Sequence, residues 1–244
     1  MSKKITLNLL LASTLFMGGC VIDQNMLASS GMDLLKAATI NDAQMKTMAS
    51  QAAIQLDAKN PVAPANNPYA IRLKKITDRL AIPDNLQLNY KVYLSDDVNA
   101  FAMADGTVRV YKGLLDLMTD DEVLFVMGHE IGHVKYQHSK KAYRLAYAAS
   151  AARKGAASGG GAIGAAASGN LGGLTEKLLN SQFSQREESQ ADSYGLQFLK
   201  YNHKNPQAAV DSLTKLQKLG GGESTMFSTH PSSAKRVADI KAQM

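Results

Sequence analysis

The chain has 244 residues, of which 45% are hydrophobic and 20% charged, so it has the size and composition of one globular domain with appendages. Its single cysteine excludes a disulfide framework and any zinc site built from several cysteines. The formal net charge is +6, but the lysines form no run of five or six and there is no tryptophan. We therefore expect no nucleic-acid binding.

The first segment, residues 1–19, has the pattern of an export signal. Lys3 and Lys4 precede an apolar run over 5–16, which is too short to span a bilayer as a helix of the mature protein. Two glycines then lead to Cys20. This arrangement resembles the lipobox of bacterial lipoproteins, and the resemblance implies that Cys20 is acylated and becomes the mature N-terminus. A simple signal peptide with an incidental cysteine is the alternative.

The residue after the cysteine indicates a destination. Val21 stands where, in the lipoproteins that this segment resembles, an aspartate would retain the protein in the inner membrane. The resemblance therefore implies a lipid anchor in the outer membrane, with the chain on the periplasmic face. No later stretch has eighteen apolar residues without a charge, so we expect no transmembrane helix.

Residues 20–60 are expected to form a lipidated tether that turns into a helix from Asp42. The helical spacing there is carried by Met45, Met48, Ala52 and Leu56. A linker rich in proline and asparagine follows at 60–68. It precedes a second helix, whose apolar face contains Tyr69, Leu73, Ile76 and Leu80.

Three short runs predict a small sheet. Residues 86–94 alternate between apolar and polar side chains, as in a half-buried strand. Asp105-Gly106 lies between strand-like runs at 101–104 and 107–111, which is typical of a hairpin. We therefore expect a small antiparallel β-sheet in a mostly helical α+β domain spanning 61–244.

The next element is predicted to be a buried helix. Residues 119–122 have the pattern of a capping box, and residues 123–134 are apolar almost all round. The glycine- and alanine-rich stretch 155–173 is expected to be a loop. Three further helices are predicted, from near Leu174 past Leu199, from Pro206, and from Pro231.

The predicted buried helix carries His129-Glu130-Ile131-Gly132-His133, the H-E-x-x-H pattern. Residues four apart share one face of a helix, so His129 and His133 can present two imidazoles to one ion. Glu130 points beside that ion, where it can take a proton from a water whose pKa zinc lowers. The alternative is a buried helix with two hydrogen-bonded histidines, which would leave the Glu130 carboxylate unpaired among apolar side chains.

A catalytic zinc needs a third protein ligand. Glu188 and Asp192 are four residues apart, which predicts that Glu188 binds the metal and that Asp192 accepts a hydrogen bond from a ligand histidine. Glu187 is a rival, although it points about 100° away from Asp192 around the helix. A solvated acidic face is the alternative to both. His138 is one residue out of phase with the extended pattern H-E-x-x-H-x-x-G-x-x-H and is expected to be structural.

These motifs together resemble the HtpX-like and CAAX-prenyl-protease-like zinc metalloendopeptidases. H-E-I-G-H at 129–133, E-x-x-A-D at 188–192 and T-H-P at 229–231 occur in the order of that family, and 99–102 and 113–115 match as well. With the lipobox, the chain is similar to the LoiP-like bacterial lipoprotein proteases. The resemblance implies a metallopeptidase domain of the zincin type with one Zn²⁺ per chain, His129, His133 and Glu188 as ligands and Glu130 as the catalytic base.

His230 matches the late histidine of the family, which is expected near the metal. Two roles stay open for it, stabilisation of the oxyanion and capping of the zinc at rest, and a surface histidine before a helix is the alternative. A peptide substrate is expected to add as an extended strand along Ala102, Met103 and Ala104, at the edge of the hairpin.

Recognition of the main chain favours loose sequence preference. We therefore expect the substrates to be unfolded or misassembled envelope proteins, and the outer-membrane assembly machinery is a candidate partner. The alternative function is that of a latent metallopeptidase that acts mainly as a chaperone-like binding lipoprotein in outer-membrane protein assembly. A purely structural lipoprotein would leave the H-E-x-x-H and E-x-x-A-D patterns unexplained.

Overall fold

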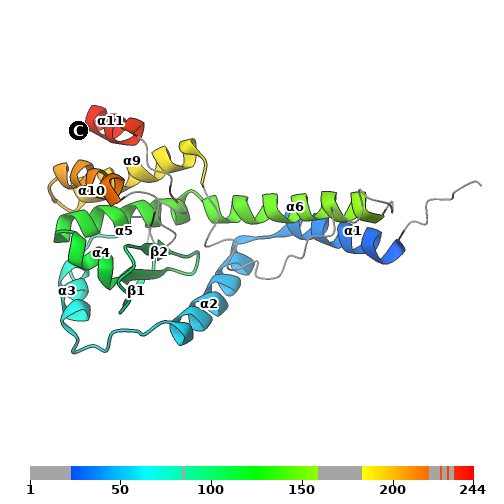
Figure 1. Cartoon of the computed structure of the whole chain (residues 1–244), viewed down its shortest axis with the longest axis horizontal. Coiled ribbons are helices and arrows are strands. Elements are labelled where there is room, and N and C mark those ends of the chain that lie inside the picture. The colour runs from blue at the N-terminus through cyan, green and yellow to red at the C-terminus, as the bar shows by residue number, and fades with distance from the viewer. Residues whose placement is uncertain (1–22, 84–85, 159–182, 220–225, 227–229, 231–233) are drawn as a thin grey trace, which may run out of the picture.

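A two-helix arm projects from a body in which helices surround a small sheet (Figure 1). The computed structural model describes residues 23–83, 86–158, 183–219, 226, 230 and 234–244. The arm consists of α1 (Gln24–Thr39) and α6 (His138–Ser158). The other helices are α2 (Asp42–Lys59), α3 (Pro68–Thr77), α4 (Lys112–Leu117), α5 (Asp120–Lys135), α9 (Gln185–Tyr201), α10 (Gln207–Leu219) and α11 (Ala234–Gln243). Within the described residues, none of the helices is both long enough and apolar enough to cross a membrane.

The sheet has three strands, β1 (Asn89–Tyr93), β2 (Ala100–Ala102) and β3 (Thr107–Tyr111), in the order β1-β3-β2. The α+β class is confirmed, and the predicted hairpin is present because β2 pairs antiparallel with β3. The expectation that the whole sheet is antiparallel is wrong, since β1 pairs with β3 in parallel. The physical reason is that residues 94–99 cross from one side of β3 to the other, so β1 and β2, which are neighbours in the sequence, pair with opposite edges of β3.

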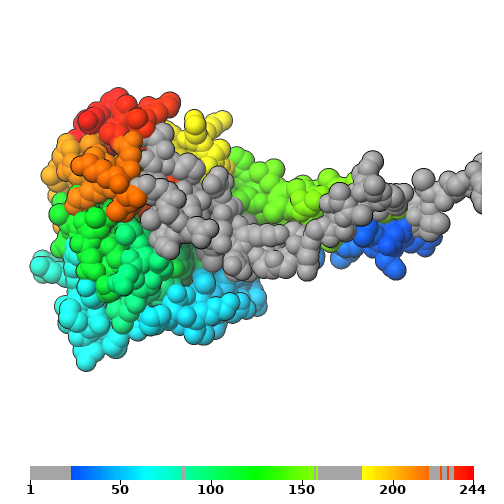
Figure 2. All heavy atoms as spheres, viewed as in Figure 1, coloured from blue at the N-terminus to red at the C-terminus, as the bar shows by residue number. Residues whose placement is uncertain are grey.

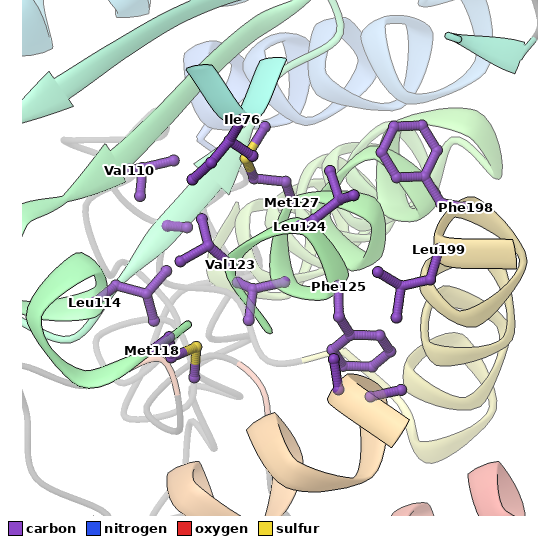
Figure 3. Close-up of a cluster of buried hydrophobic side chains, with 14 of the residues drawn as sticks. Ile76, Val110, Leu114, Met118, Val123, Leu124, Phe125, Met127, Phe198 and Leu199 are labelled. Atoms are coloured by element: carbon purple, nitrogen blue, oxygen red, sulfur yellow. The ribbon is translucent and has the colours of Figure 1, made fainter. Parts of the chain in front are cut away.

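The helix α5 is buried along most of its length and packs between the sheet and α9. The Thr119 side chain accepts from the Glu122 N–H, and the Glu122 carboxylate accepts from the Thr119 N–H, so the predicted capping box is confirmed. Figure 3 shows how residues of α5 meet α9 on one side and the sheet and α4 on the other. The side chains in this contact include Leu124, Phe125, Met127, Phe198, Leu199, Val110 and Leu114.

The close approach of α5 and α9 depends on glycines. A Cβ at Gly195 would lie 3.0 Å from the Phe125 carbonyl oxygen and 3.1 Å from the His129 nitrogen. A Cβ at Gly128 would lie 3.0 Å from the Gly195 Cα. Because contacts this short are tighter than ordinary packing, larger residues here would force the two helices apart.

The two arm helices run antiparallel. At the far end of the arm, the Asp23 N–H donates to the Ser158 carbonyl oxygen over 3.0 Å. At its base, α5 ends and the chain passes through Gln137, whose φ of 55° lies in the left-handed region, and α6 begins at the next residue and leads away from the body (Figure 1).

Several predicted boundaries differ from the described helices or lie outside the described residues. The predicted loop over 155–173 is wrong at its start, because α6 continues to Ser158, and the remainder lies outside the described residues. The predicted helix starts near Leu174 and at Pro231 also lie outside them, whereas α9 is described from Gln185 and α11 from Ala234.

Candidate metal centre and active site

Four buried side chains from three parts of the chain meet at one point. His129 and His133 come from α5, Glu188 comes from the first turn of α9, and His230 precedes α11. One ligand atom from each lies within 4.8 Å of the corresponding atoms of the other three. The i, i+4 spacing on α5 accounts for the histidine pair, and the glycine contacts between α5 and α9 bring the carboxylate against it.

The spacing of these atoms fits a tetrahedral ion. His129 Nε2 lies 3.1 Å from His133 Nε2 and 3.2 Å from His230 Nδ1. A Glu188 oxygen lies 2.9 Å from His230 Nδ1 and 3.5 Å from His133 Nε2, and its second oxygen lies 3.6 Å from His129 Nε2. Zinc bonds of about 2.0–2.1 Å in a tetrahedron separate the donor atoms by about 3.3 Å. The measured separations are close to this value.

A carboxylate holds His129 in one tautomer. Its Nδ1 lies 2.9 Å from an Asp192 oxygen, so the ring donates that proton and Nε2 keeps a lone pair that points into the cluster. Arg236 of α11 donates to the same carboxylate through Nε and Nη2, each 2.7 Å from one oxygen, and its Nη1 lies 2.7 Å from a Glu188 oxygen. Burial raises the pKa of Asp192, but hydrogen bonds from Arg236 and His129 outweigh it and lower that pKa to about 2.

His138 lies beside His133 as Asp192 lies beside His129. Its Nδ1 lies 2.9 Å from His133 Nδ1, and its Nε2 lies 3.2 Å from the side-chain oxygen of Gln190. Because an amide oxygen can only accept, His138 donates from Nε2 and accepts at Nδ1 from the His133 ring. His138 therefore stays outside the ligand cluster, as the sequence predicts, but the contact gives it a definite role in orienting His133.

The two tautomers have a common consequence. With both Nδ1 atoms donating outward, His129 Nε2 and His133 Nε2 face each other across 3.1 Å as two lone pairs. Burial lowers the pKa of both rings, opposed at His129 by the Asp192 carboxylate and reinforced at His133 by the neighbouring histidines. Two neutral imidazoles in this orientation repel each other unless a cation lies between them, so the arrangement fits a metal ion.

Glu130 lies beside the cluster and not within it. Its Oε1 is buried, has no hydrogen-bond partner among the described residues, and lies 3.5 Å from His230 Nε2. Burial, followed by the charge of Glu188, raises the pKa of Glu130 well above its usual value, while a hydrogen bond to the backbone of Ala102 acts in the opposite direction. A nearby cation would favour the carboxylate form, which is the form that a general base requires.

The rival ligand Glu187 is directed elsewhere. Its carboxylate accepts from the N–H and hydroxyl of Ser184 at the start of α9 and pairs with Lys141 at 2.8 Å. Burial raises the pKa of Glu187, but the Lys141 and Ser184 hydrogen bonds lower it to about 2. Glu187 therefore caps α9, whereas Glu188 joins the cluster.

The predicted substrate strand is the free edge of the sheet. The amide of Met103 donates to Thr107 and its carbonyl accepts from Gly106, so its main chain is used within the hairpin, and its side chain is buried against α2. Because alternate residues of a strand face opposite edges, Ala102 presents its main chain away from β3, and it is the residue that contacts Glu130. Ala104 and His133 line a hollow of about 260 Å³ beside this edge.

Two of the residues around the cluster carry roles that the sequence left unassigned. His138 could have been found from its place five residues after His133, directly beyond the end of α5. Arg236 carries no local signal, because its partners Glu188 and Asp192 lie more than forty residues earlier in the chain. Cys20 lies outside the described residues.

Comparison with known proteins identifies the class. The model of peptidase family M48 matches residues 67–244, so the chain belongs to this family and is a metalloprotease, which confirms the resemblance drawn from the motifs. The metalloprotease LoiP of Escherichia coli is 48% identical over 93% of this chain and 91% of its own length. The metalloprotease YcaL of the same organism is 40% identical over 90% of this chain and 87% of its own length. The β-barrel assembly-enhancing protease of Escherichia coli is 29% identical over 60% of this chain and 32% of its own length.

Proposed function

We propose that the protein is a zinc-dependent endopeptidase, anchored by lipidated Cys20 to the outer membrane, that hydrolyses unfolded or misassembled envelope proteins on the periplasmic face. One observation carries the chemistry: two imidazole lone pairs and a carboxylate converge within bonding distance of one ion, beside a Glu130 oxygen that has no hydrogen-bond partner among the described residues. Three histidine nitrogens and one carboxylate oxygen are the donor set of zinc sites.

The ligands of the working site would be His129, His133 and Glu188. When bound, zinc supplies polarisation of the scissile carbonyl and lowers the pKa of a water at the open position. Glu130 accepts the proton of that water as it attacks and passes the proton to the leaving amine. Asp192 and His138 keep each ligand ring in the tautomer whose free nitrogen faces the ion.

His230 would occupy the fourth position around the metal in this conformation. Its Nδ1 lies among the ligand atoms, 3.2 Å from His129 Nε2, and its ring is buried. The ring of Phe183 packs on His133 at 3.9 Å and lies 5.3 Å from the His230 ring. Of the two roles that the sequence leaves open, this arrangement favours a cap on the metal at rest, so His230 has to leave before a substrate carbonyl can bind.

The substrate would lie as an extended strand on the free edge of β2. The Ala102 carbonyl faces that edge while its N–H donates to Glu130, so a peptide that pairs with this carbonyl would lie over the metal. The hollow beside Ala104 and His133 leaves space for the neighbouring part of the peptide. Main-chain recognition requires an extended segment, which unfolded proteins expose.

Cleavage and metal content test this proposal together. Glu130→Gln should retain zinc and lose cleavage of an unfolded protein, because it keeps the ligands and removes the base. Glu188→Ala should lower zinc well below one ion per chain, whereas Glu187→Ala should not. A Glu130→Gln enzyme that cleaves at the wild-type rate would refute the role of Glu130.

The anchor is tested separately. Cys20→Ala should leave the protein unprocessed as a lipoprotein or release it from the outer-membrane fraction. A mature variant that stays in that fraction would show that another feature holds it there. Because this readout is independent of cleavage, the two halves of the proposal can fail separately.

A latent enzyme that mainly binds unfolded envelope proteins is the second candidate. The buried cluster and the position of His230 favour it, since the site is closed in this conformation. His230→Ala discriminates between roles for this residue. Higher activity or autolysis supports the cap, a loss of about 10²–10³-fold with zinc retained supports an oxyanion donor, and a wild-type rate with wild-type zinc excludes both. If wild type and His230→Ala both bind an unfolded protein and neither cleaves it, the binding function is favoured.

A further inference from the structure

The first helix of the arm has its polar and apolar faces in unusual positions. Toward α6 it presents small and polar side chains, including Ser30, buried Asp33 and buried Ala37. Most of its large apolar side chains face solvent, and four of them are more than half exposed: Leu27, Met32, Leu34 and Leu35. Part of α1, in blue, is visible on the arm in Figure 2. A helix held only by contacts with its own domain would normally bury its leucines.

Specific polar contacts hold α1 in this orientation. The Ser30 hydroxyl donates to the Ala151 carbonyl at 2.7 Å. The Asp33 carboxylate accepts from the Ser150 hydroxyl at 2.6 Å and pairs with Lys154 at 2.7 Å. Turning the helix to bury its leucines would break these contacts and expose Asp33, which is only 4% exposed. The leucine face is therefore directed outward by the fold, and an exposed apolar patch of this kind marks an interaction surface.

The charges of the arm indicate what that surface meets. Counting the cap residue Asp23, the two arm helices carry six lysine or arginine side chains and two aspartates. Lys36, Arg144 and Arg153 have no carboxylate partner within the part of the chain that the structure describes. The excess lies on α6, because α1 itself carries Lys36 against Asp23 and Asp33. The arm as a whole therefore combines exposed leucines with a net positive charge, and both favour the interface of an anionic bilayer.

We propose that the exposed face of α1, formed by Leu27, Met32, Leu34 and Leu35, lies on the phospholipid surface of the membrane that anchors the protein. This inference rests on the proposed lipid anchor at Cys20. The first residue of α1, Gln24, is only four positions after Cys20, a span of at most about 14 Å. The far end of the arm is therefore close to the bilayer. Contact between the leucine face and the lipid would then hold the arm along the membrane surface.

The orientation of the arm has a consequence for the active site. The 21 residues of α6 extend for about 32 Å, so an upright arm would hold the body at that distance from the bilayer. An arm that lies flat brings the body to the membrane surface. The edge of β2 would then meet segments that emerge from the bilayer, which is a more restricted class of substrate than soluble unfolded protein.

The experiment uses the full lipidated protein in vesicles of phosphatidylethanolamine and phosphatidylglycerol. Cys20 is the only cysteine and its lipid blocks it, so Leu34→Cys provides one site for an environment-sensitive fluorophore. We expect a blue-shifted emission that is quenched by lipids brominated near the headgroup, because such helices insert about 5–10 Å deep. The matched control is Ile71→Cys on α3, which is 55% exposed and lies on the body, and its label should report water.

The outcomes separate the candidate occupants. If the protein is bound to the vesicles but the label at position 34 still reports water, the proposal is wrong. So would efficient disulfide formation between the Leu34→Cys thiols of two chains, since that would assign the face to a second copy. Adding Leu27→Glu and Leu35→Glu should return the Leu34 label to water while the protein still floats with the vesicles.

Failure of the anchor gives a different result. If the wild-type protein does not float with the vesicles, the lipid anchor fails, and the present proposal fails with it. Cleavage of a soluble unfolded protein in detergent should be unchanged by the α1 substitutions, because α1 contributes no residue to the metal cluster. Loss of that cleavage in Leu35→Glu would contradict the separation between arm and site.

Discussion

The contact between His138 and His133 predicts a measurable effect on metal binding. His138→Leu removes the acceptor for the His133 Nδ1 proton while conserving most of the side-chain volume, so the ring is free to change tautomer or rotate. Loss of such a partner typically weakens metal binding about 10–100-fold. Since a tenfold change corresponds to about 1.4 kcal/mol, the expected cost is about 1.4–2.7 kcal/mol of zinc-binding free energy.

Competition with a chelator of known zinc affinity measures this effect, and unfolding of the metal-free protein provides a control. His138 is only 4% exposed, but the replacement is apolar and of similar volume, so the metal-free protein should lose less than about 1.5 kcal/mol. His138→Asn can keep an acceptor near the position of Nδ1 and should restore part of the affinity. Gln190→Leu acts one contact further out and should have a smaller effect.

Two results would refute this reasoning. Unchanged zinc affinity in His138→Leu, measured alongside a clear loss in Asp192→Asn, would mean that only His129 depends on its outer partner. Equal losses of affinity in His138→Leu and His138→Asn, with equal losses of stability in the metal-free protein, would indicate a packing role alone. Cleavage rates at saturating zinc should follow occupancy in both variants.

Other expected effects concern stability and helix packing. Asp57 pairs with the buried Arg109 at 2.8 Å, so Asp57→Ala should lower the free energy of unfolding by about 3 kcal/mol at pH 7, as measured in urea. Burial raises the pKa of Asp57, but the hydrogen bonds from Arg109 and Lys91 outweigh burial and hold this pKa below its usual value. The stabilisation is therefore present above about pH 4 and is lost as the pH falls toward the folded-state pKa. The difference between variant and wild type should therefore shrink at acidic pH. Gly195→Ala should destabilise the protein by about 1–3 kcal/mol through overpacking, against a gain of about 1 kcal/mol in helix propensity, and it should reduce zinc content. In the control Gly31→Ala, the added Cβ has nothing within 4 Å, so this variant should be slightly more stable than wild type and retain its zinc.

Much of the metal site could be predicted from local spacing. The pairs His129 and His133, and Glu188 and Asp192, are each four residues apart, and helix geometry alone places such pairs on one face. The capping box at Thr119 depends on four consecutive residues and was predicted for the same reason. That α5 and α9 face each other followed from resemblance to a family, since spacing within one helix does not specify its neighbour.

The sequence by itself determined the elements whose contacts are short in range: the caps, the helical faces, the hairpin turn, and which residue types could bind a metal. Only the tertiary structure decided that β1 runs parallel to β3, that Arg236 of α11 ties Asp192 to Glu188, and that the leucines of α1 face outward. Each of these depends on groups far apart in the chain. Their energies come from burial and from charge pairing between different elements, which no periodicity within a single segment encodes.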